Sequence, residues 1–144
     1  MKRTASVFAT AFSSLGAMAQ MTPVGTWHTI DDNTKEIKSE IVITESAGVL
    51  TGKVAKLLRK EAKQDAVCDE CSDDRKGKPI LGMEIIRGAK KVDGKTMWED
   101  GKILDPENGK SYTLRLTPIE DGKKLEVRGS VFGIGRTQTW VRFQ

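Results

Sequence analysis

Histidine, cysteine and tyrosine are scarce in this chain of 144 residues, which has one His, two Cys and one Tyr. A Ser-His-Asp triad would have to use His28 as its base, and no Gly-x-Ser-x-Gly segment accompanies it. A zinc site needs further Cys or His ligands beside Cys68 and Cys71. The glycine-rich stretch 129–135 lacks the Lys-Ser/Thr ending of a phosphate loop. We therefore expect no enzyme activity, no cofactor and no resident metal.

Long apolar runs and an excess of one charge are also missing. No stretch reaches the roughly 18 apolar residues of a membrane-spanning helix, so we expect no membrane span. The chain has 24 Lys plus Arg and 20 Asp plus Glu, and its net charge of +4 falls to 22 − 20 = +2 without Lys2 and Arg3. Nucleic-acid-binding domains concentrate basic residues on one face, so no nucleic-acid partner is expected. The length and the 38% hydrophobic content are typical of one globular domain.

Residues 1–19 have the three regions of a secretory signal peptide. Lys2 and Arg3 form a positive start, residues 5–19 are apolar or small and uncharged, and residues 17–19 read Ala-Met-Ala, a small-x-small cleavage pattern. A frayed N-terminal helix is the alternative interpretation. We expect cleavage after Ala19, a mature domain of residues 20–144, and a periplasmic or secreted location.

The rest of the chain has the pattern of eight strands separated by turns. Asp93-Gly94, Asn108-Gly109 and Asp121-Gly122 suit tight turns because these residues tolerate positive φ angles. Apolar and polar residues alternate with period two, as in Tyr112, Leu114 and Leu116 against their neighbours. The expected strands are 25–30, 38–45, 49–58, 81–87, 96–104, 111–117, 124–129 and 136–143.

Eight short strands in sequence predict an all-β fold, an eight-stranded antiparallel up-and-down barrel without exposed edges. A two-sheet sandwich is the alternative, although the hairpins are too short for many Greek-key crossovers. Segment 59–79, between the third and fourth strands, has no strand pattern and forms an excursion. Leu58, Ala62 and Ala66 are spaced by four, which predicts a short helix over residues 58–66.

Cys68 and Cys71 lie within this excursion. In an oxidising compartment, two thiols at this spacing are expected to form a disulfide that stiffens the loop. A redox-active pair is disfavoured because the surrounding carboxylates raise the pKa of a thiol. These carboxylates could hold calcium, but a solvated acidic loop that pairs with Arg75, Lys76 and Lys78 is the plainer interpretation. Segment 105–110 is likewise interpreted as hairpin chemistry rather than as a binding loop.

Gly25-Thr26-Trp27 opens the first strand, and Trp140-Val141-Arg142 closes the last. This arrangement resembles the calycin signature of lipocalins, fatty-acid-binding proteins and avidins, in which a basic residue of the last strand packs on the Trp of Gly-x-Trp. The resemblance implies a lipocalin-like or avidin-like barrel. It also implies a structural role for Gly25, Trp27 and Arg142, with the guanidinium on the indole face. Arg136 is the alternative partner of Trp27.

The mature chain also resembles a bacterial family known as domain of unknown function 2147. This resemblance implies a secreted or periplasmic bacterial protein and carries no activity. It rests on Gly25-Thr26-Trp27, Val67-Cys68-Asp69-Glu70-Cys71 and the segments 101–106, 109–112, 127–129 and 135–142.

Two function classes are compatible with such a barrel. The first is a module that binds a small amphipathic ligand at the barrel mouth. The second is an envelope interaction protein with a filled core, which acts through surface loops such as the excursion. Glu84, Asp100, Arg115 and Arg128 are strand charges that become site residues if they face inward. The candidate ligand-binding residues are Met83, Glu84, Trp98, Tyr112, Arg128 and Trp140.

Overall fold

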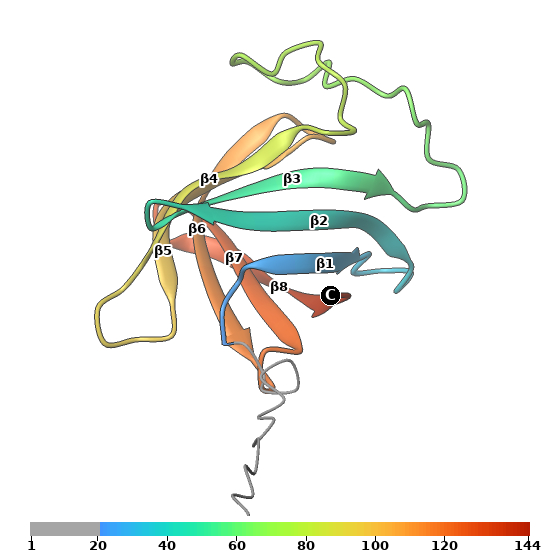
Figure 1. The fold of residues 1–144 in the computed structure, drawn as a ribbon. Helices are drawn as coiled ribbons and strands as arrows, with labels where there is room; N and C mark the ends of the chain where they lie inside the picture. Colours follow the sequence, from blue (N-terminus) through green and yellow to red (C-terminus); the bar gives the residue numbers. More distant parts are fainter. Residues whose placement is uncertain (1–20) are drawn as a thin grey trace, which may run out of the picture.

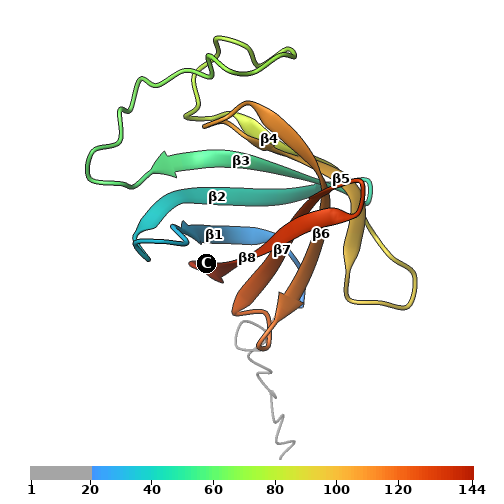
Figure 2. The same cartoon turned by 180° about the vertical axis from the view of Figure 1, so that it is seen from behind.

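Each strand pairs with the next along the chain, and the last strand pairs back onto the first. The computed structural model describes residues 21–144, which form a closed antiparallel barrel (Figure 1). Seen from behind, β8 lies beside β1, and β6 and β7 form the adjoining wall (Figure 2). The expected barrel is therefore confirmed, and the sandwich alternative is excluded. The strands are β1 Gly25–Ile30, β2 Ile37–Ser46, β3 Val49–Leu57, β4 Glu84–Lys91, β5 Trp98–Asp105, β6 Lys110–Ile119, β7 Lys124–Val131 and β8 Ile134–Arg142.

Five strand starts differ from those that the sequence predicts: those of β2 and β6 by one residue, and those of β4, β5 and β8 by two or three residues. β5 begins at Trp98 rather than at residue 96. β4 begins at Glu84 rather than at residue 81, because residues 80–83 form a turn in which Gly82 has a positive φ of 87° and the Met83 N–H donates to the Ile80 carbonyl. β8 begins at Ile134 rather than at residue 136, because the turn before it is only two residues long. Both residues of that turn, Phe132 and Gly133, have positive φ angles.

The predicted short helix over residues 58–66 is wrong: no helix is present among the described residues, and this stretch is part of the loop that links β3 to β4. The loop lies at the top of Figure 1. Two separate turns replace the helix, with Ala62 N–H donating to the Arg59 carbonyl and Ala66 N–H to the Lys63 carbonyl. Isolated helices this short are marginal in water, so packing against the barrel decides the conformation.

The core follows the period-two alternation of the strands. Leu114 and Leu116 of β6 are buried, whereas Thr113 and Arg115 between and beside them are exposed. Trp27 of β1, with no exposed surface, lies opposite Ile41 of β2 in the same layer. No helix in the described part of the chain is long and apolar enough to cross a membrane.

Candidate ligand-binding cavity

One end of the barrel is sealed by Trp27 and Arg142. The Arg142 Cζ lies 4.2 Å from the centroid of the buried Trp27 ring, so the predicted contact is confirmed. The guanidinium also donates to the carbonyls of Thr22 (2.7 Å), Val24 (2.9 Å) and Gly122 (2.6 Å). Burial lowers the pKa of Arg142 from its ordinary value.

Two further contacts complete the seal. The Trp27 Nε1–H donates to the Pro23 carbonyl at 2.7 Å, which ties the chain before β1 to the indole. A Cβ at Gly25 would lie 2.3 Å from the Arg142 Nη1, so only glycine leaves room for the guanidinium. The Gly25-x-Trp27 pattern is therefore explained by the closure that it forms with Arg142.

The opposite end of the barrel opens into a cavity of about 680 Å³. This size falls in the range of small-molecule sites. It is surrounded by the ends of β1, β3, β5 and β7 and the starts of β2, β4, β6 and β8, so every strand contributes to the wall. The deep wall is apolar and buried, and it consists of Ile41, Val54, Ile85, Leu104, Val127 and Trp140.

Two hydroxyls and one amide interrupt this apolar wall. Thr29 Oγ1 and Ser39 Oγ lie 2.7 Å apart on neighbouring strands and satisfy each other. The Gln138 Oε1 accepts from the Trp140 Nε1–H at 3.4 Å. These groups already have hydrogen-bond partners within the protein, so a ligand in the deep part of the cavity need not form hydrogen bonds with them.

The mouth of the cavity is charged. Lys38, Arg59, Lys63 and Arg136 line it together with Asp105 and Glu107. Arg59 lies 2.9 Å from Asp31 and 3.6 Å from Glu107, and Lys38 lies 3.7 Å from Glu107. Backbone N–H donors of Thr34 and Asn33 lower the pKa of Asp31, so this carboxylate stays ionised beside Arg59. A bound molecule would thus meet both signs of charge at the mouth and an apolar surface within.

Part of the wall comes from the loop between β3 and β4. Arg59, Ala62, Lys63, Ala66 and Ile80 of this loop line the cavity. The outgoing and returning halves of the loop pair with each other through backbone hydrogen bonds, such as Ile80 N–H to the Ala66 carbonyl. The excursion therefore has a place in the site, although it stands outside the strand pattern.

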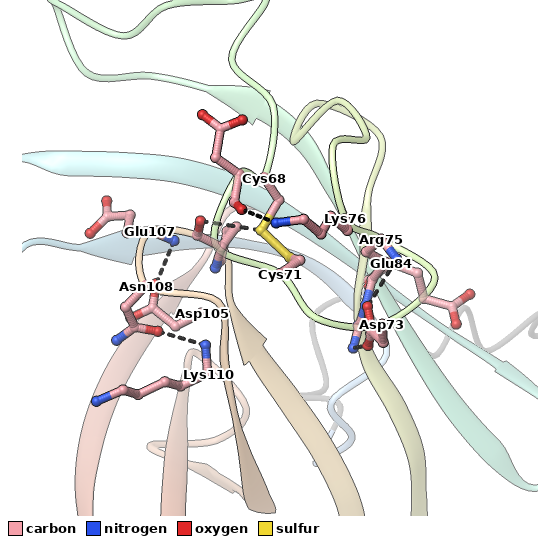
Figure 3. Close-up of a disulfide and its surroundings, with 12 residues drawn as sticks. Cys68, Cys71, Asp73, Arg75, Lys76, Glu84, Asp105, Glu107, Asn108 and Lys110 are labelled. Atoms are coloured by element: carbon pink, nitrogen blue, oxygen red, sulfur yellow. Dashed lines mark hydrogen bonds and ion pairs between the residues drawn. A yellow bond between two sulfur atoms is a disulfide. The ribbon is translucent and has the colours of Figure 1, made fainter.

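A disulfide between Cys68 and Cys71 fixes the middle of this loop, as the sequence predicts (Figure 3). Both cysteines are buried, and the Cys68 Sγ lies 3.6 Å from the carbonyl oxygen of Pro106 in the β5–β6 turn. A Cβ at Gly109 would lie 2.0 Å from the Glu70 carbonyl oxygen, so the two backbones touch here. The disulfide is thus packed between the loop and the barrel rather than exposed within a free loop.

Polar contacts of Arg75 and Arg87 fasten the acidic part of the loop to β4, and those of Arg75 are drawn in Figure 3. Arg75 pairs with Asp73 and donates from Nη1 to the Glu84 carbonyl at 2.8 Å. Hydrogen bonds from Arg75 lower the pKa of Asp73 to about 2. Arg87 makes two bonds to Asp74, at 3.0 and 3.1 Å. Within residues 21–144, no three His, Cys, Asp or Glu side chains gather as a metal site.

Only two of the six candidate ligand-binding residues lie at the cavity. Tyr112 and Trp140 line it. Met83 and Trp98 are buried in the core instead. Glu84 bonds to Arg87 outside the barrel.

Arg128 is also away from the cavity. It alternates with the buried Val127 on β7 and lies beside a small surface hollow with Glu99, Asp100 and Arg115. Whether a strand residue points into or out of the barrel follows from the register of its strand. The sequence alone therefore leaves open whether these charges face inward.

Sequence reasoning missed the cationic mouth residues and the loop residues of the wall. The sequence does not show that Lys38, Arg59 and Lys63 lie at the mouth, because their placement there depends on tertiary packing. The spacing of Leu58, Ala62 and Ala66 was nevertheless a usable signal, because two of these three residues do face the cavity.

Comparison with known proteins agrees with this architecture. A solved structure of a protein from the human pathogen Helicobacter pylori, which belongs to the lipocalin family, is similar to this chain with a TM-score of 0.69 and 21% identity. The match covers 84% of this chain and 82% of that protein, and at this identity it shows the fold alone. None of the curated proteins matches this chain. The family model described as "Uncharacterized protein conserved in bacteria (DUF2147)" matches residues 25–142, and the chain belongs to this bacterial family.

Proposed function

We propose that this protein is an exported binding protein that holds a small amphipathic molecule in the barrel. The observation that carries the proposal is the asymmetry of the two ends. One end is sealed by Trp27 and Arg142, and the other opens into a cavity of about 680 Å³ with an apolar wall and a charged mouth. Such a cavity favours a guest whose apolar part lies inside and whose polar part stays at the mouth.

The open cavity favours this function over that of a filled-core interaction protein. In a filled barrel, side chains such as Val127 and Trp140 would meet at the centre instead of bordering empty space. A non-catalytic role is supported by the position of His28, which does not line the cavity. Its ring lies 3.1 Å from Glu40 and is stacked on Phe143.

Export is supported by the composition of residues 1–19, which lie outside the described part of the structure, and by the buried Cys68–Cys71 disulfide. Mass spectrometry of protein recovered from the periplasm or medium is expected to find Gln20 at the N-terminus. Exported protein that retains Met1 to Ala19 would contradict this part of the proposal.

Cavity occlusion tests ligand binding. The probe is an anilinonaphthalene sulfonate dye, which is amphipathic and fluoresces when it leaves water. Val127→Trp adds an indole inside the cavity, and Glu126→Trp adds the same group to the neighbouring residue of β7, which does not line the cavity. We expect Val127→Trp to weaken dye binding by about tenfold or more, equivalent to about 1.4 kcal/mol, and Glu126→Trp to leave it nearly unchanged.

Circular dichroism must show that both variants remain folded. Two results would refute the proposal: a wild-type protein that does not bind the dye, or two folded variants that lose the same affinity. In either case the cavity would not be the binding site, and the alternative of a surface-acting protein would be preferred.

A further inference from the structure

The turn between β7 and β8 exposes large apolar side chains at the edge of the cavity mouth. Phe132 is 99% exposed and Ile134 is 82% exposed, and Val131 on the other side of the turn is 45% exposed. Every residue from Val131 to Thr137 is exposed, although all of them except the turn residues Phe132 and Gly133 are paired in the hairpin. Ile134 and Arg136 also line the cavity, so this hairpin tip, residues 131–134, stands at the mouth itself.

The backbone conformation of Phe132 is itself unfavourable for a bulky residue. Phe132 and Gly133 form a two-residue hairpin turn with φ angles of 53° and 79°. Asn or Asp is favoured at the first position of such a turn, because a bulky side chain at positive φ is disfavoured. A phenyl ring at this position therefore stabilises neither the turn nor the core. A strained, exposed ring of this kind is explained by contact with another molecule.

Arginines accompany the apolar tip without acidic neighbours in sequence. Residues 127–144 contain three arginines and no Asp or Glu. Arg136 and Arg128 lie three and four residue pairs behind the turn, which places Arg136 about 10 Å from the tip at the usual rise per strand residue. Arg136 lies on the cavity side, where an exposed pair with Asp32 at 3.3 Å holds it only weakly. Arg128 lies on the outer side and has only a long bond to Thr137.

We propose that the hairpin tip docks the cavity mouth onto an anionic lipid bilayer. Apolar groups that enter the boundary between headgroups and acyl chains reach roughly 5–10 Å into it. Phe132 and Ile134 at that depth would leave Arg128 and Arg136 at the level of the phosphates, where each cation adds to the attraction. A convex turn of four residues suits a soft surface, whereas a stable protein interface needs roughly 800 Å² of matched surface on each partner.

Docking of this kind would place the cavity mouth against the lipid. Four other exposed apolar residues of the described chain, Ile37, Leu58, Val67 and Leu81, directly adjoin cavity-lining residues in the sequence. An amphipathic molecule could then pass between bilayer and cavity without crossing water. This transfer step rests on the proposed function, whereas docking itself does not.

A tryptophan placed at the tip reports docking at one position. Trp27, Trp98 and Trp140 are at most 4% exposed, so their emission should respond little to a lipid surface. With vesicles of phosphatidylglycerol and phosphatidylcholine in equal parts, we expect the emission of Phe132→Trp to shift to the blue and to be quenched by brominated acyl chains. The matched control is Phe143→Trp, a 51% exposed position next to the sealed end, where neither effect is expected. Vesicle binding through the apolar residues 5–19 would not place residue 132 in the lipid, so the emission of Trp at this position distinguishes the two modes of binding.

Two variants test the chemistry of the contact. Phe132→Asn places a favoured residue in the turn, so it should fold normally and should lose sedimentation with the vesicles. Arg128→Gln in the Phe132→Trp protein should weaken vesicle binding about fivefold, and added salt should remove this difference. Dye binding without vesicles should be unchanged in Phe132→Asn and Arg128→Gln, which separates the docking from the proposed cavity function.

Three outcomes would overturn the proposal. The emission of Phe132→Trp could remain unchanged with vesicles, or that of Phe143→Trp could shift equally. A blue shift that appears without lipid as the protein concentration rises would instead assign the tip to contact between two copies of this chain.

Discussion

Replacing Arg142 by Lys tests the sealed end most directly, because the charge stays while the geometry is lost. The guanidinium bonds three carbonyls, those of Thr22, Val24 and Gly122, and lies on the Trp27 ring. These contacts join the chain before β1, the β6–β7 turn and the last strand. An ammonium group has no planar face and cannot span three separated acceptors.

The expected loss follows from these contacts. We assume that lysine keeps one of the three hydrogen bonds to carbonyls and loses two. Each lost bond is taken as about 1.5 kcal/mol, the lower value for a charged donor, because water reaches this end of the barrel. The lost stacking adds about 0.5–1 kcal/mol. Arg142→Lys should thus reduce the free energy of unfolding by about 3.5–4 kcal/mol and Tm by roughly 10–15 °C. Trp27→Ala should cost roughly 3–5 kcal/mol because it removes a buried ring, so the three carbonyls make the costs of the two substitutions similar.

Urea unfolding followed by circular dichroism measures this difference. Arg136→Lys is the matched control, since the Arg136 side chain is 72% exposed and pairs only with the exposed Asp32. Its effect should stay within about 0.5 kcal/mol. If Arg142→Lys were as stable as the control, the stacked guanidinium would not hold the barrel end, and the structural explanation of the Gly25-x-Trp27 pattern would be wrong.

Three further perturbations concern the loop between β3 and β4. Cys68→Ser with Cys71→Ser should cost about 2 kcal/mol from chain entropy alone, measured by urea unfolding, while unreduced, denatured wild-type protein should show no free thiol. Because the pKa of Asp73 is depressed to about 2 from 3.8, its stabilisation is complete above about pH 4 and is lost as the pH falls through about 2. Asp73→Asn should therefore lower Tm more near pH 6 than near pH 2, whereas an equal effect at both would contradict the ion pair. Gly109→Ala should be at least about 2 kcal/mol more destabilising than Gly94→Ala, because both have positive φ but only the Cβ at residue 109 meets backbone, 2.0 Å from a carbonyl oxygen. Equal losses would show that the loop does not press on the β5–β6 turn.

The sequence by itself determined the strands, the barrel and its closure. These features depend on local information: period-two alternation sets the buried face of each strand, and Asp-Gly and Asn-Gly mark the turns. The Trp27–Arg142 contact was also accessible, because a closed barrel of eight strands makes the first and last strands neighbours. The disulfide needed only two cysteines at short spacing.

Only the tertiary structure decided which residues surround the cavity. Trp98 and Trp140 look alike in sequence and both are buried, yet only Trp140 borders the cavity. The loop between β3 and β4 has no periodic pattern, so its contribution of Arg59, Ala62 and Ala66 depends on long-range packing. The expected strands 124–129 and 136–143 already leave Phe132 in the connection between them. The register of β7 with β8 decides that it takes the first position of a two-residue turn, where no core can reach it.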